Sequence, residues 1–225
     1  MKLDLLSTIK GSALEDFFPA GWDLARMDEL AGRSPERIGE REEYWSENYE
    51  PVECESVEDL EVRMGVEIAT QVIEARAEGR QLALILPVGP MGMYRWTIDR
   101  LEKENVSCDH VWGFNMDEWS DAEGNTLPGD APGSFQNAME EAFYDRLGEL
   151  TVPPEQRYFA TRERLEQYPG KIAELRAEGA KLVVVYGIGR ALHIAFWEPT
   201  FAAEYENAAE WKKATHRIGA RLHPL

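Results

Sequence analysis

The sequence predicts an α/β fold of three layers, a mostly parallel sheet with helices on both faces. After residue 56, short apolar runs typical of buried parallel strands alternate with longer stretches of helical periodicity. In addition, the order helix end, glycine, buried strand and glycine turn occurs twice, at residues 76–89 and 176–189. Because the same strand–helix physics selects these residues in both places, the two glycine turns are expected at the same edge of the sheet.

The expected elements follow one another with short connections. A first helix begins after Ser56, a capping residue followed three positions later by an acid, and ends near Gly79. Its apolar residues recur at helical spacing, at Leu60, Met64, Ile68 and Val72. Strands are expected at 81–88, 110–114, 157–160 and 182–186, and further helices at 91–104, 134–147 and 162–177. A polar loop rich in Gly and Pro covers 120–132.

Length and composition limit the domain count and the class of partner. The chain has 225 residues, so residues 1–55, irregular and rich in Trp, Pro, Gly and Glu, are expected to pack as an arm on a single domain at 56–225. The net charge of −18 argues against nucleic acid or an anionic membrane as a partner. The longest uncharged apolar stretch, 82–94, is too short to span a bilayer. Cys54 and Cys108 make no disulfide framework, which favours a cytoplasmic protein.

Two of the expected strands end in residues that can carry chemistry. Residues 87–92 open a helix, where free backbone N–H groups can hold a phosphate, although such Gly/Pro turns are also common structural punctuation. Residues 115–119 place Asp117 and Glu118 directly after a strand. These acids are either helix-starting charges, a metal site or a source of a general base, and they are expected to point in different directions.

The most informative segment is residues 187–199, Gly-Ile-Gly-Arg-Ala-Leu-His-Ile-Ala-Phe-Trp-Glu-Pro, which follow an apolar strand. They carry a titratable pair, His193 and Glu198, at the carboxyl end of a parallel strand, where open α/β sheets bind ligands. A lone histidine is usually structural, but the acids at the matching position of another strand favour a functional site. A phosphate turn, a carboxylate base and a His–Glu pair together suit proton transfer on a small phosphorylated sugar.

These strand ends resemble those of the glucosamine-6-phosphate deaminase and isomerase family, relatives of 6-phosphogluconolactonase. The family typically has Asn-Met-Asp-Glu-Tyr where this chain has Asn-Met-Asp-Glu-Trp at 115–119, and Pro-Glu-Ser-Tyr where it has Pro-Gly-Ser-Phe at 132–135. It also has Gly-Ile-Gly-x-Asp-Gly-His-Ile-Ala-Phe-Asn-Glu-Pro, which residues 187–199 match except at 191, 192 and 197. The resemblance covers roughly residues 60–222 and implies a Rossmann-like fold, similar to that of the deaminases and ribose-phosphate isomerases.

The resemblance implies an aldose–ketose rearrangement of a hexosamine- or hexose-6-phosphate, with or without release of ammonia. It implies that Asp117 moves a proton between C1 and C2, that His193 helps to open the sugar ring, and that Glu198 orients the histidine. Neither a cofactor nor a metal is implied, and a homo-oligomer is expected. The residues expected to contact the substrate are Val88, Gly89, Met91, Gly92, Glu118, Gly187, Gly189 and Arg190.

Three departures from the family pattern concern the substrate. The family's Asp two residues before the histidine is Ala191, the Asn before Glu198 is Trp197, and the turn at 87–92 lacks the usual Thr or Ser hydroxyls. Arg190 either replaces those hydroxyls as a contact for an anion or is a surface arginine. These changes favour a phosphorylated sugar other than glucosamine-6-phosphate, or a reduced or lost activity.

Other function classes stay open. A 6-phosphogluconolactonase-like hydrolase would need the histidine but no base at Asp117, and a non-catalytic sugar-phosphate-binding protein would bind ligand without turnover, which Ala191 favours. A nicotinamide dehydrogenase is disfavoured because Leu192 replaces the third glycine of the dinucleotide fingerprint. A metalloenzyme is disfavoured because the four histidines, His110, His193, His216 and His223, do not cluster in the sequence.

The last residues, 220–225, have the pattern of a strand leading onward. We therefore expect the chain to be part of a longer protein, with the rest of the domain following. In its absence, an exposed sheet edge is expected to be covered by a partner chain. No catalytic role is expected for His216 or His223.

Overall fold

The computed structural model describes residues 45–188, 194–197 and 199–219, and before them residues 11, 15, 23, 25, 26, 29, 33–38, 40, 41 and 43. The described residues form one sheet in the order β3-β2-β1-β4, in which every pair of strands is parallel. The strands are β1 (Leu82–Leu86), β2 (Val111–Asn115), β3 (Arg157–Tyr158) and β4 (Lys181–Val184). Short helices α3 (Pro35–Ile38) and α8 (Ala208–Trp211) lie outside this core.

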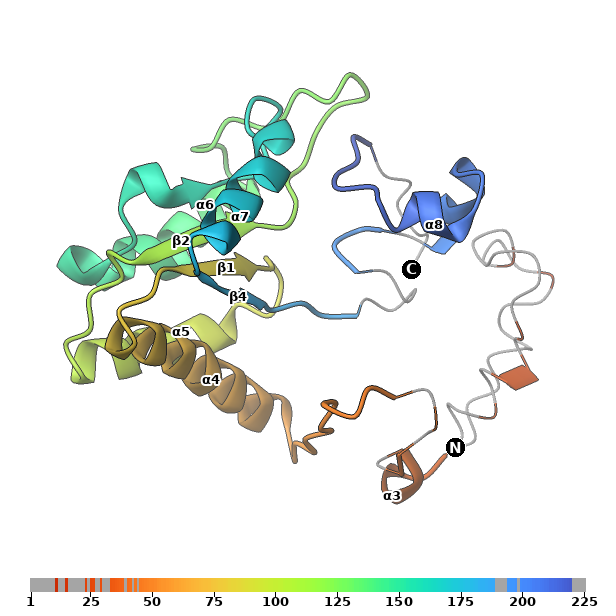
Figure 1. The fold of residues 1–225 in the computed structure, drawn as a ribbon, viewed down its shortest axis with the longest axis horizontal. Coiled ribbons are helices and arrows are strands. Elements are labelled where there is room, and N and C mark those ends of the chain that lie inside the picture. Colours follow the sequence, from red (N-terminus) through yellow and green to blue (C-terminus); the bar gives the residue numbers. More distant parts are fainter. Residues whose placement is uncertain are drawn as a thin grey trace.

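Helices cover both faces of the sheet, as Figure 1 shows. On one face, α4 (Val57–Ala77) and α5 (Gly92–Lys103) pack on the side chains of Leu82, Leu84 and Leu86. On the other face, α7 (Tyr168–Ala177) packs on the intervening side chains of β1 and on β2. This alternation follows from the period of two along a strand, which sends successive side chains to opposite faces. The predicted three-layer α/β fold is confirmed.

The two similar helix–strand junctions of the sequence have the same backbone structure. Gly79 and Gly179 both adopt left-handed conformations, with φ of 66° and 90°. The amide of the residue after each glycine donates to a carbonyl in the last turn of the helix, that of Ala75 or Leu175, over 2.9 Å in both cases. Because β1 and β4 then run side by side in parallel, the turns that follow them leave the sheet at the same edge, as predicted.

Two predicted helices are shorter and less regular than expected. The helix predicted at 134–147 is α6 (Phe135–Met139), followed by a π-helical turn (Glu140–Tyr144) and a 3₁₀ segment (Asp145–Leu150). The wider π turn lets the neighbouring aromatic side chains Phe143 and Tyr144 both enter the core. The helix predicted at 162–177 begins as α7 only at residue 168, because Pro169 lacks an N–H donor and is tolerated only in the first turn.

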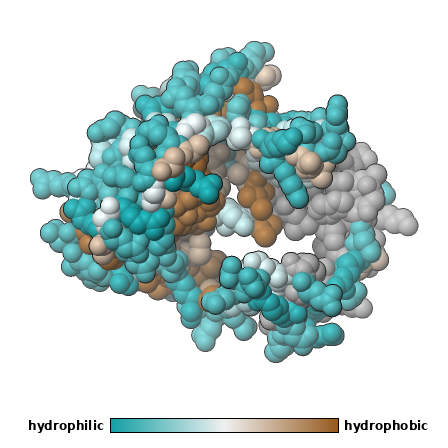
Figure 2. Space-filling view, in the orientation of Figure 1, coloured by the Kyte–Doolittle hydropathy of each residue, from teal (hydrophilic) through white to brown (hydrophobic). Residues whose placement is uncertain are grey.

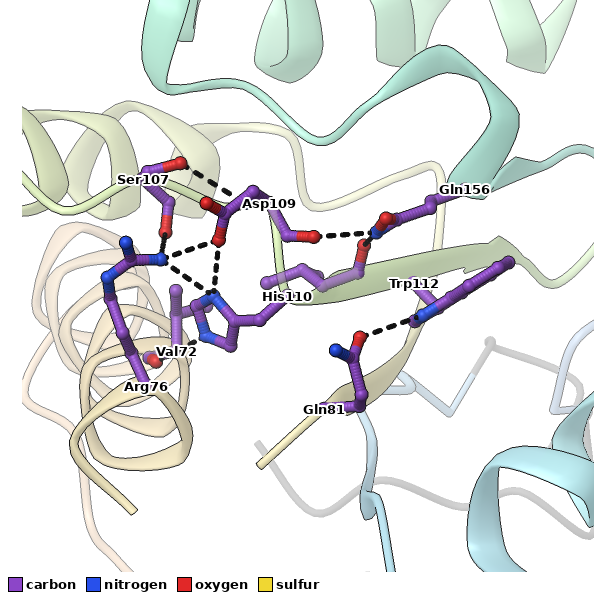
Figure 3. Close-up of polar contacts among 9 residues, drawn as sticks. Val72, Arg76, Gln81, Ser107, Asp109, His110, Trp112 and Gln156 are labelled. Atoms are coloured by element: carbon purple, nitrogen blue, oxygen red, sulfur yellow. Dashed lines mark hydrogen bonds and ion pairs between the residues drawn. The ribbon is translucent and has the colours of Figure 1, made fainter. Parts of the chain in front are cut away.

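His110 is a structural histidine, shown in Figure 3. It precedes β2 and is 8% exposed. Its Nε2 donates to the Val72 carbonyl of α4 over 2.9 Å, and its Nδ1 faces the Arg76 guanidinium at 3.5 Å. Arg76 also forms an ion pair with Asp109, at 2.6 Å. These contacts tie α4 to the amino end of β2. His110 therefore lies at the opposite end of the strands from the predicted site, which is at their carboxyl ends.

The outer edge of β4 is open in the described part of the chain, where no strand pairs with it. Leu182 and Val184 lie beside Ala83 and Ile85 of β1, on the face of the sheet where α7 packs, but they are outside the α7 cluster and are 37% and 44% exposed. The expected homo-oligomer stays a prediction, as do the boundaries of the arm and the domain.

None of the described helices has both the length and the apolar composition to cross a membrane.

Candidate functional site

A cavity of about 370 Å³ lies beyond the carboxyl ends of β2 and β3. Its lining comes from four segments that are distant in sequence: 116–126 after β2, 160–168 after β3, the turn at 195–197, and residues 215–219. Figure 2 shows that the surface in this view is mostly hydrophilic and that some hydrophobic side chains are exposed near its middle. The position agrees with the general rule that parallel α/β sheets bind ligands at the carboxyl ends of their strands.

Asp117 is the predicted catalytic residue that the structure places in this cavity. Its Oδ1 atom is buried and has no hydrogen-bond partner among the described residues. Burial, and to a lesser degree the charge of Glu118, raise the pKa of Asp117 to about 6. A carboxylate with a pKa near neutrality that lacks an internal partner is suited to accept a proton from a bound molecule.

Glu118 lines the same cavity, and its carboxylate holds the neighbouring loop. Its carboxylate accepts hydrogen bonds from the amides of Trp119, Phe135 and Gln136 at 2.8–2.9 Å, and from the Ser134 hydroxyl at 3.1 Å. The donors at residues 134–136 lie at the start of α6, where a negative charge is favourable. The two carboxylates therefore differ in their surroundings, since Oδ1 of Asp117 has no described partner, and the expected difference in direction stays a prediction. A substrate contact by Glu118 stays a prediction, since both of its oxygens already accept bonds.

We expect Glu118→Gln to lower the free energy of unfolding by about 1–3 kcal/mol, because an amide cannot accept at both positions and leaves buried donors unpaired. The same change removes a like charge beside Asp117, so the pKa of Asp117 should fall. Urea denaturation and an NMR titration of Asp117 measure the two effects. Glu141→Gln, on the exposed side of the turn after α6, is the matched control. Equal stability of the two variants would contradict the capping role.

The turn at 194–197 brings the most informative sequence segment to the cavity. The Trp197 amide donates to the Ile194 carbonyl over 2.9 Å, and both central residues, Ala195 and Phe196, have left-handed φ, at 51° and 54°. Glycine or asparagine usually occupies such positions, so this backbone is strained. The strained turn places the Phe196 ring 5.6 Å from the Trp119 ring, and Trp119 lies 5.3 Å from Phe135. The cavity therefore has an aromatic wall.

The remaining predicted site residues fall into two groups. Those of the first turn and the glycine after β4 are described but do not line the cavity: Val88, Gly89, Met91, Gly92 and Gly187. Their turns nevertheless adjoin it, because Leu86 pairs with Asn115 and the Met116 amide donates to the Leu86 carbonyl over 3.2 Å. Four residues lie outside the described part of the chain, namely Gly189, Arg190, His193 and Glu198. Their roles stay predictions.

The structure adds cavity residues that the sequence did not point to. Arg162 follows β3, and His216 and Arg217 belong to the segment at 215–219. No motif marks these positions, and their chain neighbours are ordinary loop residues. Only the tertiary structure brings them to Asp117. Within the described part of the chain, no three histidine, cysteine or acidic side chains lie close enough together to hold a metal ion.

Comparisons with known proteins point to one family. Over 140 residues the chain is 32% identical to a glucosamine-6-phosphate deaminase of Caenorhabditis elegans, which covers 59% of this chain and 48% of the relative. Over 150 residues it is 31% identical to the glucosamine-6-phosphate deaminase of Erwinia tasmaniensis, which covers 61% of this chain and 50% of the relative. The chain thus spans about half the length of these curated relatives. No family model matches it.

A solved structure agrees with these relatives. The chain is similar to a monomeric glucosamine-6-phosphate deaminase of the NagB superfamily, with a TM-score of 0.51 and 25% sequence identity. The similarity covers 64% of this chain and 57% of that chain. Sequence and fold comparisons therefore confirm the family resemblance that the strand ends predicted.

Proposed function

We propose, from the premise that this chain is related to the glucosamine-6-phosphate deaminases, that it catalyses proton transfer between C1 and C2 of a hexosamine- or hexose-6-phosphate. Asp117 takes the proton from C2 of the open-chain aldose and returns it to C1. The electron pair of the C2–H bond forms a C1–C2 double bond while the C1=O π pair moves to O1, which takes a proton, and an enediol or enolamine results. Protonation at C1, with loss of the O–H or N–H proton of the group on C2, gives the ketose or its imine. Addition of water to an imine then releases ammonia.

The observation that carries this proposal is the environment of Asp117. Its carboxylate lies in a cavity at the carboxyl end of β2, its Oδ1 is buried without a described partner, and its pKa is raised to about 6. A base serves best when its pKa lies near the working pH, because it is then ionised and still able to hold the proton. The aromatic wall of Trp119 and Phe196 suits the apolar C–H face of a sugar.

His193 and Glu198 complete the proposal. They flank the turn at 194–197 in the sequence, and that turn contributes Phe196 and Trp197 to the cavity. We assign ring opening to His193, by proton transfer between the ring oxygen and the C1 hydroxyl, and orientation of its imidazole to Glu198. Trp197 replaces an asparagine of the family pattern and lines the cavity, which favours a substrate shaped differently from glucosamine-6-phosphate.

The test is exchange of the C2 proton in heavy water, followed by NMR, with glucosamine-6-phosphate and glucose-6-phosphate as probes. We expect deuterium to enter C2 of at least one of them. Below pH about 6 the rate should fall tenfold per pH unit, because protonated Asp117 cannot act as a base and its pKa is about 6. Ammonia release with the hexosamine would identify a deaminase, and exchange without it an isomerase. Saturable binding without exchange would contradict the proposal in favour of a sugar-phosphate-binding protein, and hydrolysis of 6-phosphogluconolactone alone in favour of a lactonase.

A further inference from the structure

Basic side chains line the cavity together with Asp117. Arg162 comes from the loop after β3, and His216 and Arg217 come from the segment at 215–219. They occur in a chain with 42 acidic against 24 basic side chains, in which a cation has many carboxylates to pair with. A basic side chain without a carboxylate partner is therefore the one available to bind an anion in the cavity.

Of the two arginines in the cavity, Arg162 is the one without an ion pair among the described residues. Its Nη1 donates to the Glu123 backbone carbonyl over 3.0 Å, and no described carboxylate lies within ion-pair distance of it. Arg217, in contrast, makes two bonds to the Glu204 carboxylate, of 2.7 and 3.2 Å, and lies over the Phe201 ring. A guanidinium has several N–H donors in a fixed plane, so Arg162 retains donors and an uncompensated charge for an anionic ligand.

The loop at 120–132 is shaped to hold Arg162 in this position. Gly124 has a left-handed φ of 83°. A Cβ at Gly124 would lie 2.5 Å from Nη1 of Arg162 and 2.6 Å from Cγ2 of Ile218, a residue of the segment at 215–219. The missing side chain therefore makes room for the guanidinium and for this segment together. Held at Nη1 by the Glu123 carbonyl, the guanidinium needs little reorganisation to receive a ligand.

The alternative place for an anion, the start of α5, already holds a negative charge. The Glu61 carboxylate occupies the position that a Cβ on Gly92 would take, so it lies against the first residue of that helix. No side chain caps the helix there, and the turn at 87–92 offers no hydroxyl donor. A phosphate bound at this turn would face a carboxylate at close range, which is unfavourable.

We propose that Arg162, with the ring N–H of His216 as a second donor, forms an anion subsite that receives the phosphate group of the substrate. The proposal rests on the proposed function for the identity of the substrate, and it places the phosphate on the loop after β3 instead of on the turn after β1. Guanidinium and phosphate match as a charge-assisted, bidentate pair, so this contact sets how far the sugar carbons lie from Asp117.

The test is a titration of the full chain with inorganic phosphate at pH 7.5, followed by phosphorus NMR. We expect Arg162→Ala to weaken phosphate binding about 10- to 100-fold, and Arg162→Lys to restore part of it. Arg164→Ala is the matched control, since Arg164 belongs to the same loop but lies over the Tyr158 ring and does not line the cavity. It should bind phosphate like the wild type.

Two other possible phosphate sites are each tested with a variant. Gly89→Asp adds a carboxylate to the turn after β1, where a Cβ meets no atom within 4 Å. Arg190→Ala removes the arginine that the sequence offered as an anion contact. Loss of binding in either variant with no loss in Arg162→Ala would overturn the proposal, as would a wild type that does not bind phosphate.

This binding measurement is independent of turnover. If phosphate binding depends on Arg162 while no sugar phosphate exchanges its C2 proton, the anion subsite holds and the proposed reaction fails. If exchange occurs and Arg162→Ala binds phosphate normally, the reaction holds and the subsite fails.

Discussion

Asp117→Asn should reduce the rate of C2 proton exchange about 10²- to 10⁴-fold, the usual contribution of a positioned general base. Asparagine has nearly the same shape but cannot take up a proton, so binding of inorganic phosphate should be unchanged. Deuterium incorporation and phosphate titration measure the two properties separately. Asp130→Asn, an exposed acid of the following loop, is the control and should retain full exchange. Normal exchange in Asp117→Asn would remove Asp117 from the reaction.

The same substitution should stabilise the fold at alkaline pH. The pKa of Asp117 is about 6 in the folded chain, against about 3.9 in an unfolded one, so the folded state holds the proton more tightly. Below pH about 4 the group is protonated in both states and has no effect. As the pH rises from about 4 to above 6, the Asp117 carboxylate becomes charged in the folded state, and this buried charge lowers the free energy of unfolding by about 1–3 kcal/mol.

Asp117→Asn carries no charge at either pH, so its gain in stability should appear at pH 8 and vanish near pH 4. Urea denaturation at the two pH values measures the difference. A variant that is less stable than the wild type at pH 8 would show that the Asp117 carboxylate has a stabilising partner. A gain in stability joined to a loss of exchange would identify a group kept for chemistry at a cost to the fold.

The parts of the fold that could be predicted are those governed by local rules. The capping of α4 by Ser56, whose hydroxyl accepts from the Asp59 amide over 3.0 Å, is a contact between residues three apart. The glycines at 79 and 179 end helices because left-handed backbone is needed there. Parallel strands have continuous apolar runs, so β1 and β4 were visible in the sequence, but the expected burial holds for β1 and was wrong for Leu182 and Val184 of β4, which are exposed. In each case a few neighbouring residues carry the whole physical cause.

The irregular helices depend on tertiary packing and were not predictable in the same way. A period of 3.6 residues does not reveal that Phe143 and Tyr144 both enter the core, and this is what the π turn accomplishes. Pro169, in contrast, was a visible signal. It can occupy only the first turn of α7, so the predicted start at residue 162 was wrong for a reason present in the sequence.

The residues of the candidate site likewise fall into those that local sequence could predict and those that depend on tertiary contacts. Asp117 could be predicted because a strand end and a family motif coincide there. The role of Glu118 could not, because its partners Ser134, Phe135 and Gln136 lie 16 to 18 residues away and meet it only through the folded loop. Arg162 belongs to no motif, and its place in the cavity depends on Gly124 and the Glu123 carbonyl. Contacts between distant loops decide the shape of a site, and one sequence does not specify them.

The second large expected effect is on stability, at the contact between α4 and α5. Gly65 is buried in the middle of α4, and its carbonyl accepts from the Thr97 hydroxyl of α5 over 3.1 Å. A Cβ at this position would run into the Met93 carbonyl oxygen, and would lie 2.6 Å from the Trp96 Cβ and 3.1 Å from the Thr97 amide. These are mostly backbone atoms or atoms fixed to the backbone, so they cannot move aside without moving α5.

Gly65→Ala should therefore lower the free energy of unfolding by about 2 kcal/mol, although alanine is the better helix former by about 1 kcal/mol. Gly170→Ala is the matched control, a glycine near the start of α7 where a Cβ meets nothing within 4 Å. There only the helix propensity changes, and stability should rise by about 0.5 kcal/mol. Urea denaturation of both variants measures effects of opposite sign from the same chemical change. If both glycine replacements stabilise the chain, the two helices are not in backbone contact at Gly65. Since α5 follows the turn after β1, such a result would also mean that the start of α5 lies at a different place relative to Asp117.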